Sequence, residues 1–196
     1  MITNHTELLN ALIAKHNLKS YLEIGVQNPA NNFDKIKCER KVGVDPAFNQ
    51  PDVIYPITSD EFFSSYCLDT KIGTGFDLIF IDGLHHADQV KRDFENSLRC
   101  LSDNGFIVIH DVLPDNEPGT KVPRETKQWW GDVYKFAMNL HTYSNIDFIT
   151  FNIDNGCMVI RKTDTIRPSF AHHDYTWDQY REQGHKRMNV TSTVEI

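Results

Sequence analysis

Acidic residues and histidines come directly after apolar runs in this sequence, which is where residues that act on a ligand often stand. The clearest case is the apolar run Leu78–Ile81, which leads into Asp82 and is followed by Gly83, His85 and His86. An apolar run that ends in an acid is a poor arrangement for stability alone. A histidine with an ordinary pKa near ~6.5 can accept a proton at neutral pH. The segment therefore predicts acid–base chemistry on a bound substrate.

The same pattern recurs along the chain. In an open α/β sheet, ligands bind beyond the carboxyl ends of the strands. A single acid at such a position is more often a cap than a ligand-binding residue, but acids at five strand ends favour a binding site along one rim. The residues at the five expected strand ends are Glu23 with Gly25, Asp45, Asp60, Asp82, and His110 with Asp111.

Apolar periodicity places these residues on alternating strands and helices. Strands are expected at 20–26, 41–46, 52–57, 76–82 and 104–111, with a hairpin over 146–162 around Asn155-Gly156. Helices are expected at 6–18 with Thr6 as cap, 59–67 with Ser59 as cap, 86–101, 127–141 and 177–183. Alternation of this kind predicts a parallel sheet covered on both faces, with the hairpin adding an antiparallel edge.

Composition limits the classes of protein to consider. The chain has 196 residues and a formal net charge of −7, which argues against binding nucleic acid through phosphate neutralisation. It lacks a signal peptide and any apolar stretch near the ~20 residues that cross a bilayer. The four cysteines show no CxxC pair and are expected to be reduced. We therefore expect a cytoplasmic protein that binds neither a membrane nor nucleic acid.

The position of Asp45 indicates the kind of ligand. It lies 20 residues after Gly25, the spacing at which an acid typically accepts the hydroxyls of a ribose. The alternative is a turn-forming Asp-Pro pair. The sequence lacks the glycine patterns that hold a pyrophosphate or the phosphates of ATP. A cofactor with a ribose but no phosphate, such as S-adenosylmethionine, fits better.

Several motifs in this order resemble those of the class I S-adenosylmethionine-dependent methyltransferases, in particular a subgroup of small bacterial and phage proteins. They are "YLEIGV", "VGVDP", "LIFIDGLHHADQVKRD", "NGFIVIHD" and "WWGDVYKF", and the resemblance runs from about Tyr21 to Lys162. It implies a Rossmann-like, doubly wound α/β fold with a mostly parallel seven-stranded sheet and an antiparallel terminal hairpin. The methyltransferase domain is expected at 1–165, followed by a polar C-terminal extension at 166–196.

The resemblance also implies roles for individual residues. Glu23 and Gly25 match the motif that lines the amino-acid part of the cofactor, Asp45 the acid that holds the ribose, and Asp60 the adenine contact. Asp82 and Gly83 match the motif between cofactor and acceptor. The family often shows E-x-G-x-G-x-G in the first motif, whereas here Gln27, Pro29 and Asn31 stand at or near the missing positions.

For catalysis, His85 aligns with the histidine of a D-G-x-H pattern in related O-methyltransferases. We expect His85, and after it Asp82, to be the catalytic residues beside the transferred methyl group. We expect His86 to begin the following helix. The alternative is that both histidines are polar residues at a helix start. Asp82, His110 and Asp111 are weaker candidates for a Mg²⁺ site, since oxygen ligands suit a hard cation; otherwise His110 is a buried, hydrogen-bonded residue.

The predicted function is O-methylation of a small molecule or glycan. The loop from Leu113 to Glu125 is expected to act as a lid, and Trp129, Trp130 and Tyr134 either stack on the acceptor or pack in the core. The alternative function is a non-catalytic Rossmann-like protein that binds cofactor or a partner. The sequence leaves the acceptor and the oligomeric state open, a homo-oligomer included.

Overall fold

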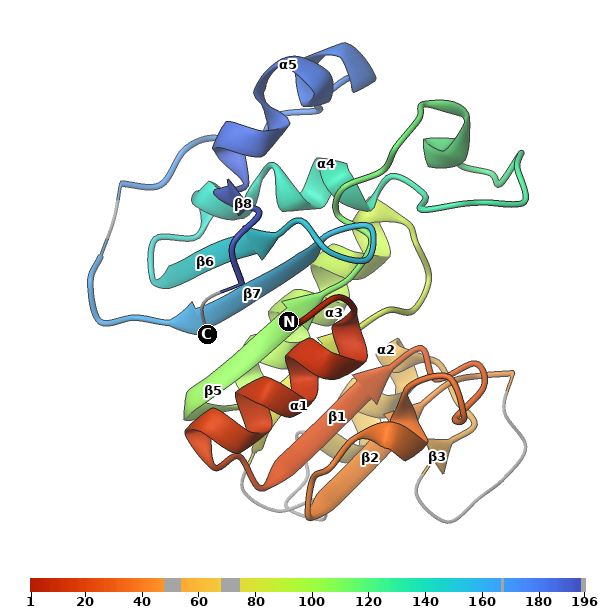
Figure 1. Cartoon of the computed structure of the whole chain (residues 1–196), viewed down its shortest axis with the longest axis vertical. Helices are drawn as coiled ribbons and strands as arrows, with labels where there is room; N and C mark the ends of the chain where they lie inside the picture. Colours follow the sequence, from red (N-terminus) through yellow and green to blue (C-terminus); the bar gives the residue numbers. More distant parts are fainter. Residues whose placement is uncertain (48–53, 68–74, 167, 195–196) are drawn as a thin grey trace.

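The structure is a computed structural model that describes residues 1–47, 54–67, 75–166 and 168–194. Eight strands alternate with helices along the chain (Figure 1). The strands are β1 (Ser20–Ile24), β2 (Arg40–Val44), β3 (Ile54–Tyr55), β4 (Phe76–Ile81), β5 (Leu101–Ile109), β6 (Ile146–Phe151), β7 (Cys157–Lys162) and β8 (Val190–Thr191). The helices are α1 (His5–His16), α2 (Ser59–Phe62), α3 (Ala87–Cys100), α4 (Val133–Ala137) and α5 (Trp177–Arg187), and η1, η2, η4 and η5 are short helical turns.

All eight strands form one sheet in the order β3-β2-β1-β4-β5-β7-β6-β8. β7 runs antiparallel to its neighbours β5 and β6, and the other neighbouring strands pair in parallel. The expected Rossmann-like sheet with a terminal hairpin is therefore confirmed. The short β8, which pairs with β6, adds one strand to the seven that were predicted. Residues 52 and 53 of the expected third strand lie outside the described part of the chain.

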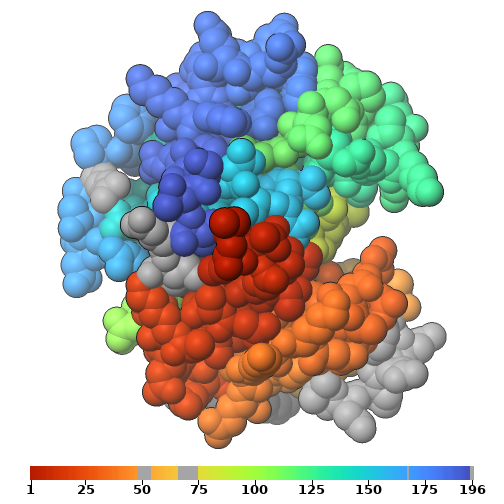
Figure 2. Space-filling model, viewed as in Figure 1, coloured from red at the N-terminus to blue at the C-terminus, as the bar shows by residue number. Residues whose placement is uncertain are grey.

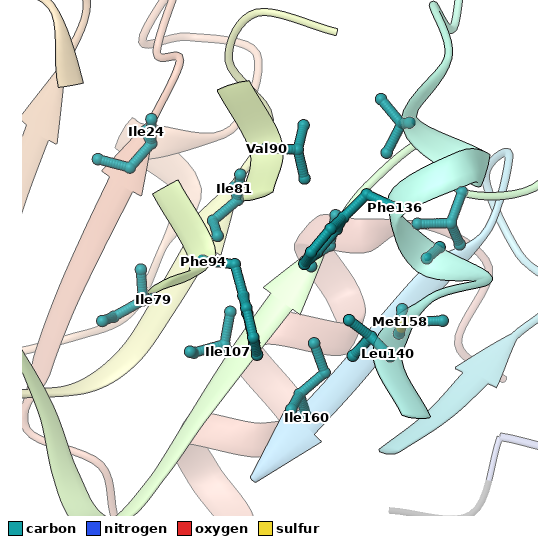
Figure 3. Packing of buried hydrophobic residues seen from close by; sticks show 14 of the residues in the cluster. Ile24, Ile79, Ile81, Val90, Phe94, Ile107, Phe136, Leu140, Met158 and Ile160 are labelled. Atoms are coloured by element: carbon teal, nitrogen blue, oxygen red, sulfur yellow. The ribbon is translucent and has the colours of Figure 1, made fainter. Parts of the chain in front are cut away.

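Each face of the sheet is covered by its own hydrophobic core. Alternate side chains of the central strands pack on one face against α3, α4 and the C-terminal segment (Figure 3). The opposite face packs against the buried leucines of α1. Because adjacent residues of a strand point to opposite faces, β4 contributes Ile79 and Ile81 to the first core, and Leu78 and Phe80 to the second. This packing on both faces holds the strand ends at one fixed rim.

Several helix boundaries differ from the sequence predictions. Asn4 caps α1 by accepting a hydrogen bond from the Glu7 amide, and Thr58 forms a capping box with Glu61 at the start of α2. Both predicted caps, Thr6 and Ser59, are thus wrong, because an acceptor stands ahead of each. α3 matches its prediction within one residue at each end. The C-terminal helix is longer than predicted and ends at Arg187.

The expected helix over 127–141 is wrong in its first part. α4 begins only at Val133, because Gly131 has a φ of +60°, which interrupts a right-handed helix. The preceding residues instead form an irregular segment that lies against the loop after β4. That segment contacts His85 through the carbonyl of Trp129.

The C-terminal residues pack onto the same core as the main sheet. Tyr175, Tyr180 and Met188 are buried in the core of α3 and α4, and the Tyr180 hydroxyl donates a hydrogen bond to the carbonyl of Pro114. In the described part of the chain, no helix has the length and apolar character needed to cross a bilayer. The domain boundary after residue 165 remains a prediction.

The expectation that all four cysteines are reduced is wrong, as Cys100 shows. Cys100 takes part in a disulfide bond, whereas Cys38 and Cys157 are free. Wide spacing in sequence gave no sign of this bond, because the chain distance between cysteines does not report their distance in the fold. The side chain of Cys67 lies outside the described part of the chain.

Candidate active site

The turn after β1 lies directly on the end of β4. Gly25 has a φ of +94°, and a Cβ at this position would stand 2.2 Å from the carbonyl oxygen of Asp82 and 2.5 Å from the Cα of Gly83. Only glycine fits, for reasons of both backbone angle and space. The predicted cofactor-binding turn and the predicted catalytic segment are therefore neighbours across two paired strands.

The next turn residue, Gln27, also has a positive φ, +50°. Its amide donates a hydrogen bond of 2.7 Å to Oδ2 of Asp45, while Oδ1 of Asp45 accepts one of 2.9 Å from the amide of Ala47. The left-handed conformation that a second glycine would adopt freely is thus adopted by Gln27 and held by Asp45. Asp45 is buried and links the turns after β1 and β2.

Glu23 lies beneath this rim in a buried hydrogen-bond network. Its Oε2 accepts hydrogen bonds from the Tyr21 hydroxyl at 2.6 Å and from Nδ2 of Asn32 at 2.9 Å. Asn32 in turn accepts a hydrogen bond from Thr6 of α1. Burial raises the pKa of Glu23 to about 8. The network accounts for Glu23 as a structural residue, and its contact with a cofactor remains a prediction.

Asp60 stands in the first turn of α2 and is half exposed. Its Oδ1 accepts a hydrogen bond of 3.3 Å from Nε2 of Gln89, and its Oδ2 lies 3.4 Å from Nε of Arg92. Both partners belong to α3. The structure thus joins Asp60 to the helix that follows the catalytic segment, and its role as an adenine contact remains a prediction.

Four residues at the ends of β4 and β5 form one charged cluster, which we call the hub: Asp82, His85, His110 and Asp111. Nε2 of His85 lies 3.4 Å from Oδ1 of Asp82, and its Nδ1 lies 3.5 Å from Oδ2 of Asp111. Nδ1 of His110 lies 3.1 Å from the same Oδ1 of Asp82. The two histidines therefore flank Asp82 from two strands.

The hub favours the charged forms of His110, Asp82 and His85, whereas burial raises the pKa of Asp111. Burial disfavours the imidazolium of His110, but Asp82, Asp111 and Asp154 outweigh burial and raise its pKa to about 10. Burial likewise opposes ionisation of Asp82, yet His110 and His85 hold its pKa well below the usual range. The pKa of His85 is raised because Asp82 and Asp111 outweigh the effect of its burial.

The irregular segment before α4 fixes the position of His85. The carbonyl of Trp129 lies 3.3 Å from Nδ1 of His85, and the indole of Trp129 stacks on the imidazole with ring centroids 5.3 Å apart. A Cβ on Gly131 would lie 1.7 Å from the carbonyl oxygen of His85, so only glycine allows this approach. Trp130 and Tyr134, in contrast, are buried in the core.

His86 is the N-cap residue of α3, as expected, but its side chain makes no cap hydrogen bond. Asp132 fills that role: its Oδ1 accepts a hydrogen bond of 2.7 Å from the amide of Ala87. The amide of Asp132 also donates to the carbonyl of His85. Two hydrogen bonds therefore join the start of α3 to the segment before α4.

Sequence reasoning missed two residues beside the hub. Oδ2 of Asp154, in the turn between β6 and β7, accepts a hydrogen bond from the backbone amide of His5 at 3.1 Å. The same oxygen lies 2.5 Å from Nδ1 of His5, at the start of α1, and the carbonyl of Asp154 lies 2.7 Å from Nε2 of His110. His5 follows no apolar run and Asp154 belongs to a hairpin turn, so only the fold brings them together at the rim.

Two groups of three side chains offer ligand atoms within 4.8 Å of one another. One comprises Asp82, His85 and Asp111, and the other comprises His5, His110 and Asp154. The predicted metal set of Asp82, His110 and Asp111 is thus divided between the two groups. Metal binding by Asp82, His110 and Asp111 remains a prediction.

Comparison with known proteins agrees with this architecture. Residues 40–112 match the model of a family described as a methyltransferase domain. The SAH-bound Podospora anserina methyltransferase PaMTH1 has a TM-score of 0.55 and 19% identity, with 81% of this chain and 78% of that chain covered. The O-methyltransferase from Bacillus cereus in complex with SAH has a TM-score of 0.60 and 13% identity, with 83% and 80% covered.

A third structure is similar over half of its own length. The MycE methyltransferase from the mycinamycin biosynthetic pathway, in complex with Mg, SAH and mycinamycin VI, has a TM-score of 0.52 and 16% identity. The match covers 82% of this chain and 50% of that one. At these identities the structural similarities establish the shared fold.

Proposed function

We propose that the chain is a class I S-adenosylmethionine-dependent methyltransferase, as its fold and its matched domain indicate, and that it methylates a hydroxyl oxygen of a small molecule or glycan. The observation that carries this proposal is the contact between the turn at Gly25 and the segment Asp82–His85. A cofactor bound along that turn would lie next to a histidine held between two carboxylates. The chain thus offers a binding turn and a proton acceptor at one place.

The residues at the rim fit the proposed cofactor. Each oxygen of the Asp45 carboxylate keeps a second lone pair beyond its backbone hydrogen bond. Ribose hydroxyls are donors suited to those lone pairs. When bound, S-adenosylmethionine supplies a methyl group that is already activated by the sulfonium charge. The protein then has to orient the acceptor and remove its proton.

His85 is the residue that we assign as the base. Nδ1 of His85 faces the Trp129 carbonyl and the Asp111 carboxylate, while Nε2 faces Asp82. A neutral His85 can take the acceptor's proton, and the two carboxylates stabilise the imidazolium that results. Asp82 is held ionised by His110, so we assign it to orient His85 rather than to accept the proton itself.

A hard cation also fits this hub. Oδ1 of Asp111 is buried without a hydrogen-bond partner, which is the condition expected of an oxygen that awaits a cation. Asp82 and Asp111 would hold Mg²⁺ through oxygen atoms, and His85 could then ligate the ion or act as base, but not both at once. The structure of the similar MycE methyltransferase contains Mg. Loss of activity in EDTA and its return with Mg²⁺ would support a metal, and unchanged activity would exclude it.

A non-catalytic, cofactor-binding protein is the second candidate, and one observation favours it. The turn after β1 keeps only its first glycine, and Gln27 adopts a left-handed conformation at a cost of about 1–2 kcal/mol. This cost could weaken cofactor binding. The hub argues for catalysis, because a binding protein has no need of a histidine poised between two carboxylates.

The remaining predictions concern location and partners. We propose a cytoplasmic enzyme whose acceptor approaches over Trp129 and the loop from Leu113 to Glu125. Trp129 is partly exposed beside His85 and can stack on a flat acceptor or a sugar ring. The C-terminal residues 166–196 are proposed as an extension that packs on the domain. A homo-oligomer remains a proposal.

The function is tested by methyl transfer from S-adenosylmethionine labelled in its methyl group. The purified chain is incubated with panels of catechols, phenols and sugars, and labelled product is counted with and without added Mg²⁺. A chain that binds S-adenosylmethionine by calorimetry and labels a hydroxyl compound supports the proposal. Tight binding with no labelled product across the panels favours the non-catalytic alternative.

A further inference from the structure

The second group of ligand atoms lies outside the catalytic residues assigned above. His5 begins α1, His110 ends β5, and Asp154 stands in the turn between β6 and β7. In the space-filling view, the red start of the chain lies directly against the cyan turn segment (Figure 2). Three elements that are distant in sequence therefore meet at this point, which shares His110 with the hub.

The donors are two imidazole nitrogens and one carboxylate oxygen. Oδ2 of Asp154 lies 2.5 Å from Nδ1 of His5 and 3.7 Å from Nε2 of His110. Two histidines with one carboxylate form a common ligand set for zinc with a position left open. Tetrahedral ligands at zinc's bond lengths stand roughly 3.3 Å apart, so the His5–Asp154 pair must open by about 1 Å.

One side of His110 matches a metal-binding histidine, whereas its Nε2 lies 2.7 Å from the carbonyl oxygen of Asp154, a hydrogen bond that a bound ion must displace. Its other ring nitrogen, Nδ1, lies 3.1 Å from Oδ1 of Asp82. A carboxylate that accepts a hydrogen bond from the distal ring nitrogen fixes the ring orientation and raises the basicity of the ligating nitrogen. The ring of His5 is held too, because it stacks on Phe80 with centroids 5.3 Å apart.

Charge and access also favour a cation. Asp82, Asp111 and Asp154 all lie within 3.7 Å of His110. His5 and Asp154 expose 21% and 28% of their side chains, so an ion can enter from solvent. A group of buried and half-buried carboxylates around two imidazoles attracts positive charge of any kind, whether protons or a metal ion.

We propose that His5, His110 and Asp154 form a binding site for a divalent transition metal ion of the zinc type. Binding replaces the protons on Nδ1 of His5 and Nε2 of His110, which are released to solvent, and the ion joins α1 to the ends of β5 and β6. This site uses other ligand residues than the carboxylate-rich group proposed for Mg²⁺, which it touches through the contact of His110 with Asp82. The nitrogen ligands select zinc over magnesium, because Mg²⁺ prefers oxygen and keeps its waters.

The test uses the full chain carrying His85→Ala, so that the group of Asp82, His85 and Asp111 cannot bind zinc through its histidine. The protein is freed of metal with a chelator, and binding of Zn²⁺ is measured by calorimetry at pH 8 in the presence of excess Mg²⁺. Co²⁺ serves as a coloured probe of the same site. His5→Ala is compared with His16→Ala, which removes a histidine at the other end of α1.

We expect one Zn²⁺ per chain, a visible Co²⁺ spectrum, and a loss of affinity of more than about tenfold in His5→Ala but not in His16→Ala. Zn²⁺ should also raise the melting temperature of the parent and of His16→Ala. If His5→Ala does not fold, Asp154→Asn replaces it with the same expected loss. Equal Zn²⁺ affinity in the parent and His5→Ala, or no Zn²⁺ binding by the parent, overturns the proposal. Both outcomes are independent of methyl transfer.

Discussion

The two halves of the proposed active site are built in different ways. The cofactor half, around the turn at Gly25, is shaped by backbone angles and backbone hydrogen bonds, with Asp45 as its main charged group. The catalytic half, the hub, is shaped by charged side chains that hold one another. Substitutions in the two halves should therefore have different effects. Added bulk should damage the turn, and loss of charge or of a proton acceptor should damage the hub.

The largest effect is expected in the hub, from His85→Ala. Loss of a positioned base typically slows a reaction by about 10²–10⁴-fold, and the affinity for S-adenosylmethionine should not change because the turn is untouched. The measurement is kcat for labelled methyl transfer beside cofactor affinity by calorimetry. His86→Ala is the matched control and should retain activity. A His85→Ala enzyme as fast as the parent would remove this residue from the mechanism.

In the turn, Gly25→Ala should cost about 3 kcal/mol or more of folding free energy. The added Cβ meets the carbonyl oxygen of Asp82 at 2.2 Å and also requires an unfavourable backbone angle. Gly83→Ala is the matched control, since its Cβ would meet a methyl group of Ile24 at 3.3 Å and the backbone of Ile24 at 3.7 Å, an ordinary van der Waals distance. Denaturant unfolding of both variants is the measurement. Equal stabilities would show that the turn tolerates side chains and that our steric account is wrong.

The pH dependence of methyl transfer should report the charges of the hub. The pKa of His85 is raised, so this base is protonated and inactive below that pKa. The rate should therefore rise with pH through a midpoint above ~6.5, by about tenfold per pH unit on the acidic side. The measurement is kcat/KM against pH, repeated in EDTA to separate any effect of a metal. A midpoint below ~6.5 would contradict the raised pKa.

The smallest effect is expected from Gln27→Gly. Glycine at this position removes about 1–2 kcal/mol of backbone strain from the folded state. It also makes the unfolded chain more flexible, which offsets part of the gain, so the free energy of unfolding should rise by about 0.5 kcal/mol. Affinity for S-adenosylmethionine should stay the same or rise. Asn17→Gly, at the left-handed cap of α1, is the control and should leave that affinity unchanged. A weaker cofactor affinity in Gln27→Gly would show that the glutamine side chain itself takes part in binding.

The sequence predicted the sheet and those parts of the site that are local in the chain. Asp82 and His85 are three residues apart after one strand, and Gly25 with Asp45 follows a known spacing, so pattern alone could place them at one rim. His5 and Asp154 could not be found in this way, because their contact spans 149 residues and depends on how α1 crosses the sheet. No local pattern records such a contact.

Gly131 and Glu23 show two further limits of prediction from the sequence. Gly131 lies inside the helix expected over 127–141, whereas in the fold it interrupts that helix and allows the close approach that fixes His85. Glu23 follows the motif of a cofactor contact, yet its carboxylate is engaged by Tyr21 and Asn32 inside the protein. In both cases, the partner across the fold decides what the residue does.

The central claim is that Asp45 and the turn at Gly25 bind the ribose of S-adenosylmethionine next to the hub. Calorimetry of S-adenosylmethionine binding to the parent, Asp45→Asn and Asp60→Asn tests it most directly. We predict that Asp45→Asn weakens binding by roughly 10–100-fold, the value of a hydrogen bond to a charged group, and that the half-exposed Asp60 contributes less. Equal affinity of the parent and Asp45→Asn, or no binding by the parent, would contradict the account.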